Sequence, residues 1–402
     1  MSGQPKHTVL LVGDARMAFP VAKALNQDGN SVHAGVSVFS NYLEWSRHVS
    51  ADFYHPSLEP GTDEALDHYK SWIEAHSEID TLQPVSEAGL RFLSRHRDWF
   101  EGRAALIMAP QKAVEIAHDK AAMFELCREL SVPLAAFARV TSFEETEAAL
   151  ADIGYPAIIK PSSVDAPLFG RKALILKSQD DFNRLFPNWP EVHPELLVQR
   201  YIRGPRHSVI FSARVGELLG AVQIRAARTH EADGTGYTTY GVTVEPDPEV
   251  KRSVESLSGA LDYSSTGCIQ FVIDPDTGEK TFMELNARVS LGRISECAGL
   301  PHSVWGLKIA HGEPVAGFAD PWSTRVGTEY VWTKGELNLI AQMAAGGKLG
   351  AGAMARWLGQ TAWDALRCHH AIFDPLDPMP AIGVYGNKII SRFRNRQLTK
   401  AP

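Results

Sequence analysis

The sequence predicts a protein of mixed α/β and α+β architecture with more than one domain. Residues 8–38 alternate strand, helix and strand, which is typical of the start of a parallel sheet. Residues 196–228 alternate apolar and β-branched residues with polar ones and predict strands of a larger antiparallel sheet. Residues 267–288 predict a two-stranded hairpin. A chain of 402 residues has room for two or three domains.

The composition excludes several classes of protein. With 44% hydrophobic and 22% charged residues and a net charge of −7, the chain gives no reason to expect nucleic-acid binding. Its four scattered cysteines favour neither a zinc site nor a disulfide framework, so we expect a cytoplasmic location. We find no apolar run that predicts a transmembrane segment and no pattern of a signal peptide. The basic tail at 386–400 leaves contact with an anionic membrane surface as an alternative to a solvated helix.

The N-terminal part reads as alternating strands and helices of a parallel sheet. Its first turn contains only Gly13, so the three spaced glycines of a dinucleotide-binding fingerprint are absent, and this disfavours a nicotinamide role. The expected elements are strands at 9–12, 31–38, 81–85 and 105–110 and helices at 18–26, 64–75 and 87–96.

The middle of the chain predicts a small α+β module followed by the larger sheet. Asp119 is a good N-cap for a helix that stops near Ser131, before Pro133. After about residue 315 the composition changes and becomes rich in tryptophan. The further expected helices lie at 143–152, 179–186, 247–261, near 302, at 337–344 and at 353–358.

The hairpin gathers oxygen-bearing side chains on one face. Folding it about Thr277 places Gln270 opposite Glu284, and because side chains alternate along a strand, Asn286 shares that face. Hard cations such as Mg²⁺ prefer oxygen ligands of this kind. The alternative is an ordinary solvated face. The opposite face carries the residues expected in the core: Ile269, Phe271, Met283 and Leu285.

Four segments in a fixed order carry a resemblance to a known family. They are DKAAMFELCRELSVP at 119–133, YPAIIKPSS at 155–163, LLVQRYIRGPRHSV at 196–209, and FMELNAR at 282–288. With these, the chain resembles ATP-grasp enzymes, of the branch similar to the carbamoyl-phosphate synthetase large subunit and the carboxylate–amine ligases. The resemblance covers about residues 5–310.

The resemblance implies a domain order. A Rossmann-like pre-ATP-grasp domain would occupy residues 1–112, and a two-lobed ATP-grasp domain residues 113–312. Within the latter, a small lid lobe would span about 119–197 and a larger antiparallel-sheet lobe about 198–312. Residues 313–402 would form a C-terminal lobe.

The resemblance also implies the nucleotide-binding residues. Lys120 and Lys160 stand where the family places lysines on the nucleotide phosphates, for which a compact ammonium on a flexible stem is well suited. Gln199 and Ile202 match the positions whose backbone meets the adenine, with Tyr201 nearby. Arg206 stands where many relatives have an acidic residue, which leaves the ribose contacts open.

The loop after Lys160 departs from the family pattern. Residues 161–172 contain one glycine, Gly170, and a proline, where relatives have a glycine-rich lid that binds phosphate through backbone amides. Ser162, Ser163 and the end of the loop at Gly170, Arg171 and Lys172 could still reach a phosphate. This loop leaves open whether turnover is full, weakened or lost.

The resemblance assigns Gln270, Glu284 and Asn286 as magnesium ligands for two ions, with Mn²⁺ as a possible substitute. Arg288 would stabilise an acyl phosphate and the oxyanion that follows it. A basic residue at Arg225 or Arg228 would meet the transferred phosphate, and Arg225 is slightly favoured.

These assignments predict an ATP- and Mg²⁺-dependent ligase that joins a small carboxylate substrate to an amine through an acyl phosphate. The alternatives are a carboxylase or carboxyphosphate-forming enzyme of the same fold, or a nucleotide-binding regulator with weak turnover. Family analogy suggests a homodimer. The acid and the amine are not encoded in any motif.

Overall fold

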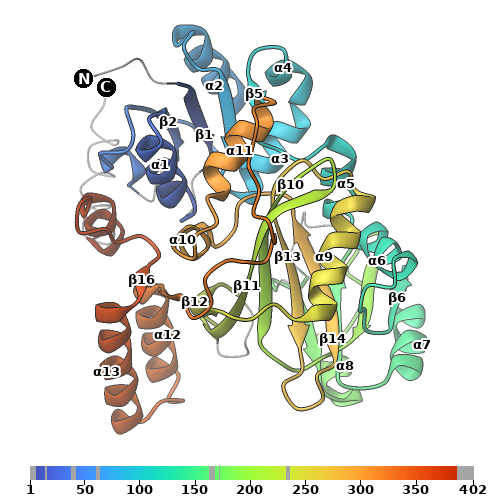
Figure 1. Cartoon of the computed structure of the whole chain (residues 1–402). Coiled ribbons are helices and arrows are strands. Elements are labelled where there is room, and N and C mark those ends of the chain that lie inside the picture. The colour runs from blue at the N-terminus through green and yellow to red at the C-terminus, as the bar shows by residue number, and fades with distance from the viewer. Residues whose placement is uncertain are drawn as a thin grey trace, which may run out of the picture.

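Three β-sheets organise the chain in the computed structural model, which describes residues 6–13, 16–37, 42–59, 64–162, 168–171, 173–231 and 236–386 (Figure 1). One sheet is N-terminal and parallel, one is small and antiparallel, and one is large and almost entirely antiparallel. Ser163, Lys172 and the basic tail after 386 lie outside the described residues.

The N-terminal sheet has five parallel strands in the order β3-β2-β1-β4-β5. The parallel pairing agrees with the strand–helix–strand pattern of the sequence. The strands are β1 (Thr8–Val12), β2 (Ser31–Val36), β3 (Ala51–Tyr54), β4 (Thr81–Pro84) and β5 (Ala105–Leu106). The helices of this part are α1 (Ala18–Gln27), the 3₁₀ turn η1 (Leu43–Trp45), α2 (Glu64–Ala75), α3 (Glu87–Arg95), α4 (Arg97–Glu101) and α5 (Gln111–His118).

Gly13 lets the loops at the carboxyl edge of this sheet approach closely. Its φ is +93°, and a Cβ at Gly13 would lie 2.2 Å from the hydroxyl oxygen of Ser86. The end of β1 and the start of α3 are therefore in direct contact. Ligands bind at this edge in open parallel sheets.

The small sheet has the strand order β6-β9-β7-β8 and is antiparallel. Its strand β9 was expected in the larger sheet, and that expectation is wrong, because β9 pairs with β6 and β7. The alternation of apolar residues in β9 is compatible with either sheet, so the local sequence pattern does not determine which sheet the strand joins. The elements are α6 (Lys120–Glu129), β6 (Phe137–Val140), α7 (Phe143–Ile153), β7 (Ala157–Pro161), β8 (Leu174–Leu176), α8 (Gln179–Leu185) and β9 (Leu196–Arg200).

The large sheet has the order β14-β13-β10-β11-β12-β15-β16. It continues past residue 312, since β15 pairs with β12, so the expected boundary there crosses one continuous sheet. Its strands are β10 (Arg206–Arg214), β11 (Glu217–Thr229), β12 (Thr238–Thr243), β13 (Ser265–Ile273), β14 (Lys280–Asn286), β15 (Glu329–Val331) and β16 (His369–His370). The accompanying helices are α9 (Pro248–Ala260), α10 (Gly292–Cys297), α11 (His302–Ala310), α12 (Thr333–Ala345) and α13 (Ala351–Arg367).

The hairpin β13–β14 has the expected pairing at its polar positions. Gln270 lies opposite Glu284, as predicted from alternation about the turn. A bulge after Gln270 then shifts the register, so Phe271 lies opposite Phe282. Phe282 is buried and Met283 only half-buried, which corrects the expectation that Met283 belongs to the core face. The bulge adds one unpaired residue, and the sequence carries no signal for it.

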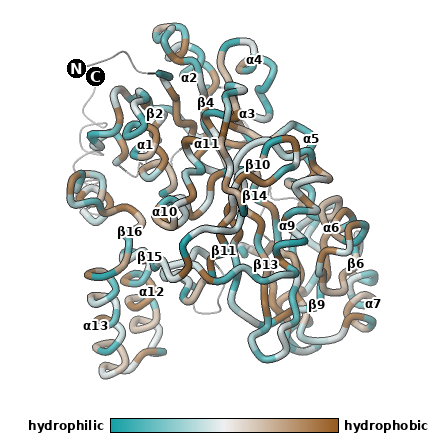
Figure 2. The backbone as a smooth tube through the Cα atoms, in the orientation of Figure 1, coloured by the Kyte–Doolittle hydropathy of each residue, from teal (hydrophilic) through white to brown (hydrophobic). Residues whose placement is uncertain are grey.

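Hydrophobic packing joins the three sheets. Hydrophobic residues gather along the central strands (Figure 2). One buried cluster runs from Leu10 and Leu82 of the N-terminal sheet to Phe271 and Phe282 of the hairpin. Phe124 of α6 belongs to the same cluster and meets Phe282 edge to face. The hairpin is therefore fixed relative to both neighbouring sheets.

Helices α12 and α13 pack side by side, beyond the β16 end of the large sheet (Figure 1). Both are longer than the helices expected at 337–344 and 353–358. None of the described helices is long and apolar enough to cross a membrane.

Candidate active site

The polar face of the hairpin presents an unsatisfied acceptor beside a carboxylate. Asn286 Nδ2 donates to Glu284 Oε1 at 2.9 Å, and Gln270 Nε2 donates to Ser208 Oγ at 3.2 Å. The buried Gln270 Oε1 has no hydrogen-bond partner among the described residues. Buried polar atoms rarely lack a partner. An oxygen-binding cation would satisfy this acceptor, and Glu284 opposite Gln270 would supply a charged oxygen ligand beside it.

Arg288 links the hairpin to the N-terminal sheet. Its guanidinium donates to Asn286 Oδ1 at 3.2 Å and to Glu87 Oε2 at 2.8 Å. His118 Nε2 lies 3.0 Å from the other Glu87 oxygen. Burial alone would raise the pKa of Glu87, but the contact with His118 and the charge of Arg288 outweigh it and lower that pKa to about 2. Glu87, at the start of α3, therefore holds Arg288 in position.

The two candidate phosphate-binding lysines approach each other where α6 meets β7. Lys160 Nζ is buried, donates to Gln199 Oε1 at 3.0 Å, and lies 4.5 Å from the ring centre of Phe124. Lys120 Nζ donates to the carbonyl of Pro161 at 3.1 Å. Burial, with the charge of Lys120, lowers the pKa of Lys160 to about 7, while the charge of Glu284 opposes this. The small sheet thus presents a positive group towards the hairpin carboxylate.

The segment expected to receive the adenine lies at the end of β9, the strand that pairs with β7. The side-chain Nε2 of Gln199 is buried and has no partner among the described residues. Tyr201 donates its backbone N–H to the carbonyl of Pro156 at 2.9 Å, and Ile202 is buried. Ser162 Oγ donates to the carbonyl of Glu195 at 3.2 Å, and Gly170 lies in a turn with a φ of +76°. Those predicted nucleotide-binding residues that the structure describes thus cluster around the ends of β7 and β9, except Gly170, whose position relative to them no contact fixes.

The structure does not bring Arg225 to this site. Arg225 pairs with His207, whose neighbour Ser208 pairs with Gln270, so Arg225 and Gln270 point to opposite faces of the sheet. Arg225 is also exposed. This geometry removes the slight preference for Arg225. The sequence of one strand does not reveal which sheet face a residue occupies relative to the hairpin, because that depends on the pairing with neighbouring strands.

Arg228 is held by the C-terminal helices. A register shift precedes it in β11. Its guanidinium donates to Glu336 Oε1 at 3.0 Å and to Asp364 Oδ2 at 2.6 Å, and both acids are fully buried. It also lies 4.3 Å from the ring centre of Tyr240. In this arrangement Arg228 connects β11 to α12 and α13.

Sequence reasoning missed a role for Arg16 and singled out Arg206 only as a departure. Arg16 follows β1 at the carboxyl edge of the parallel sheet, and Arg206 begins β10 on the same face as Gln270. Ligands bind at the carboxyl ends of the strands in open parallel sheets, and this rule applied to the end of β1 points to Arg16.

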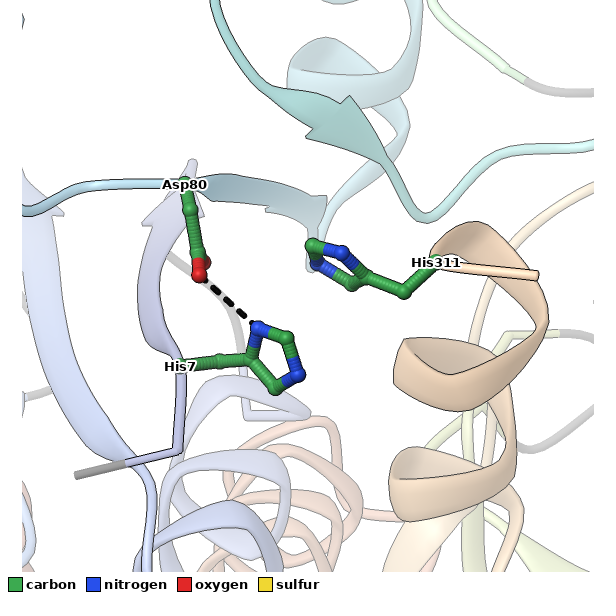
Figure 3. A group of neighbouring side chains, drawn as sticks. All are labelled: His7, Asp80 and His311. Carbon is green, nitrogen blue, oxygen red and sulfur yellow. Dashed lines mark hydrogen bonds and ion pairs between the residues drawn. The ribbon is translucent and has the colours of Figure 1, made fainter. Parts of the chain in front are cut away.

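A second cluster of titratable side chains lies at the opposite edge of the N-terminal sheet. His7 and Asp80 directly precede β1 and β4, and His311 follows α11 (Figure 3). His7 lies 2.8 Å from Asp80 and 2.9 Å from Glu313. Because it lies at the amino ends of the parallel strands, this cluster is separate from the Glu87–Arg288 region.

Comparison with known proteins gives matches in sequence and in fold. The family model described as carbamoyl-phosphate synthase L chain, ATP binding domain, matches residues 246–317, which include the hairpin. A carbamoyl phosphate synthase large chain from Clostridium acetobutylicum is 28% identical over 211 residues, or 50% of this chain. The chain spans 19% of the length of that relative.

Two solved structures share the fold at low sequence identity. One is the biotin carboxylase domain dimer of Hydrogenobacter thermophilus 2-oxoglutarate carboxylase, in complex with MgADP, ADP and bicarbonate. It has a TM-score of 0.62 and 19% identity, over 81% of this chain and 74% of that one. The other is an L-amino acid ligase from Bacillus licheniformis, with a TM-score of 0.59 and 13% identity, over 77% and 75% of the two chains.

The solved structures show the fold: the chain shares the ATP-grasp fold of this carboxylase domain and this ligase. In sequence, the chain resembles the ATP-binding domain of carbamoyl-phosphate synthase large chains, which confirms the resemblance stated from the motifs.

Proposed function

We propose that this protein is an ATP- and Mg²⁺-dependent ligase that couples a carboxylate to an amine. The observation that carries the proposal is the buried Gln270 Oε1, which has no donor among the described residues and lies opposite Glu284, a carboxylate whose charge acts on Lys160. A cation and a polyphosphate would satisfy this group of side chains together. The likeness to an L-amino acid ligase supports an amine as the second substrate.

The proposed reaction has two balanced steps. A substrate carboxylate oxygen attacks the γ-phosphorus of ATP, the bond to the bridging oxygen breaks, and ADP leaves with an acyl phosphate remaining. The amine then attacks the acyl carbon, and phosphate and one proton are released as the amide forms. Magnesium, when bound, neutralises charge on the phosphates.

The residues of this chain would act by positioning and charge. Lys120 and Lys160 would bind phosphate oxygens, with Gln199 orienting Lys160. Gln270, Glu284 and Asn286 would hold the cation. Arg288, fixed by Glu87, would donate to the oxyanion that develops at the acyl carbon. Arg225, on the far face of the sheet, has no part in this proposal.

A second candidate is a carboxylase-type reaction in which bicarbonate replaces the organic acid. The biotin carboxylase domain of the same fold was solved with bicarbonate, which supports this alternative. Bicarbonate would give a carboxyphosphate through the same first step. A nucleotide-binding regulator is the third possibility, because the loop at 161–172 has a single glycine.

The deciding experiment is a screen for ADP release. Purified protein with MgATP would be given a panel of acids, each with and without a panel of amines, and bicarbonate as a separate arm. If the protein is the proposed ligase, ADP should form only when both an acid and an amine are present, and mass spectrometry should detect the condensed product. Release with bicarbonate alone favours the carboxylase, and nucleotide binding without any release favours the regulator.

Two variants test the residue assignments. Glu284→Ala and Lys160→Ala should each abolish detectable ADP release. Unchanged activity in one of these variants would contradict the role proposed for the substituted residue. A homodimer, a cytoplasmic location and Mn²⁺ in place of Mg²⁺ are further parts of the proposal, the first supported by the dimeric biotin carboxylase domain.

A further inference from the structure

Arg16 reaches from the N-terminal sheet to the aromatic residues of the large sheet. Its guanidinium carbon lies 4.0 Å from the ring centre of Trp332 and 4.7 Å from that of Tyr237. Stacking on a ring uses the face of the guanidinium and leaves its N–H groups free to bind in the plane. Arg16 Nη1 is buried and has no partner among the described residues.

Arg206 is a second guanidinium with an unused donor. Its Nη2 donates to Thr238 Oγ1 at 3.1 Å, but its buried Nε has no partner in the described part of the chain. Burial lowers the pKa of Arg206, and the charges of Glu284 and Arg16 act on it in opposite directions. Arg206 therefore lies within electrostatic reach of both Glu284 and Arg16, and it shares the sheet face of Gln270.

Two neutral donors complete the group. Trp332 Nε1 and the hydroxyl of Tyr330 are both buried without partners among the described residues. Tyr330 is fully buried in β15, and the charge of Arg16 acts on its pKa, which burial raises. Four buried donors in one neighbourhood are unusual, because each unsatisfied group costs folding free energy.

The two guanidinium groups among these four side chains favour the binding of an anion. Neither Arg16 nor Arg206 forms an ion pair among the described residues, whereas Arg228 and Arg288 are each paired with buried or half-buried carboxylates. An acceptor-only group with two oxygens matches the planar donors of guanidinium groups. A carboxylate is such a group.

We propose that Arg16, Arg206, Tyr330 and Trp332 bind a substrate carboxylate that is not activated in the reaction. This inference rests on the proposed function, because Arg206 shares the sheet face of Gln270 and Glu284, where that function places the substrates. The carboxylate belongs either to a dicarboxylic acid, whose other end is activated, or to an amino acid that supplies the amine. The recognised chemistry is the same in both cases.

The test is a binding measurement that needs no turnover. Isothermal titration of the full chain with MgADP present, at constant ionic strength, would compare short dicarboxylates with their monoamides and the standard amino acids with their amides. In one of these arms the carboxylate should bind about tenfold or more tightly than its amide, equivalent to about 1.4 kcal/mol. The arm that shows the difference identifies which substrate carries the group.

Matched variants assign the difference to this group. Arg16→Ala should remove the advantage of the carboxylate over the amide, and Trp332→Phe, which keeps the ring and removes the N–H, should reduce it. Arg103→Ala is the control, because Arg103 also lies over a tryptophan, Trp99, at 4.1 Å but in the N-terminal part away from the site. It should leave the advantage intact. Thermal unfolding of each variant checks that it is folded.

Three results would overturn the inference. The first is the absence of any carboxylate advantage in the wild-type protein, and the second is its survival in Arg16→Ala. The third is a loss of MgADP affinity in Arg16→Ala equal to the loss of carboxylate affinity, which would assign the arginine to the nucleotide. A carboxylate advantage without ADP release in any acid-plus-amine mixture would reject the ligase but keep the subsite.

Discussion

Lys160 is buried and lies where we expect the phosphates of the nucleotide to bind. Because its pKa is lowered to about 7, the side chain is charged below that pH and increasingly neutral above it. We predict that MgADP affinity falls as pH rises through about 7, by up to about tenfold per pH unit at the steepest. Lys160→Arg stays charged and should show a flatter dependence. Titration calorimetry across this pH range measures both, and equal slopes would remove the role of Lys160.

Glu284 and Glu279 offer a matched pair of carboxylates on one hairpin. Glu284 faces Gln270, whereas Glu279 lies at the turn and pairs with Arg200. Glu284→Gln should raise the Mg²⁺ concentration needed for half-maximal ADP binding by about tenfold or more, because it removes the charged ligand. Glu279→Gln should leave that concentration unchanged. A magnesium titration of ADP binding checks this, and a similar response of both variants would contradict the assignment.

At the scale of elements, Arg228 fixes the pair of helices α12 and α13 to β11. Arg228→Ala would leave Glu336 and Asp364 buried without a cationic partner from β11, and should reduce the free energy of unfolding by about 3–5 kcal/mol. Arg225→Ala, on the same strand but exposed, should change it by less than about 0.5 kcal/mol. Urea unfolding of the two variants tests this. Equal effects would mean that the Arg228 pairs do not hold the helices.

The cluster at the amino edge of the N-terminal sheet predicts pH-dependent stability. Burial lowers the pKa of His7, but the contacts with Glu313 and Asp80 outweigh it and raise the pKa above its ordinary value. Protonated His7 therefore stabilises the fold below about pH 6.5, and this contribution is lost as pH rises through the raised pKa. His7→Gln should lower stability by at most about 1 kcal/mol near pH 6 and by less near pH 8.

Unfolding in urea at the two pH values measures the His7 effect. The Asp80→Asn variant removes one partner and should reduce the difference between wild type and His7→Gln. A difference that grows with pH would contradict the ion pair of His7 with Asp80, shown in Figure 3, and that of His7 with Glu313.

At the scale of the whole molecule, the sequence pattern predicted the features that depend on residues near each other in the chain. The pairing of Gln270 with Glu284 followed from side-chain alternation and a turn, and the cap at Asp119 followed from residue type. The acid partners of Arg228 lie 108 and 136 residues further along the chain, so no local pattern reveals them. The contact of Arg16 with Trp332 likewise depends on how the N-terminal and large sheets pack.

The central claim is that ATP activates a carboxylate on the hairpin face. The most direct test supplies the acid panel with ¹⁸O in the carboxylate, together with MgATP and the amines, and analyses the released phosphate by mass spectrometry. The account predicts that one ¹⁸O passes from the acid to inorganic phosphate as ADP forms, and that Glu284→Ala abolishes both signals. Unlabelled phosphate accompanying amide formation, or no ADP above the level of Glu284→Ala, would contradict it.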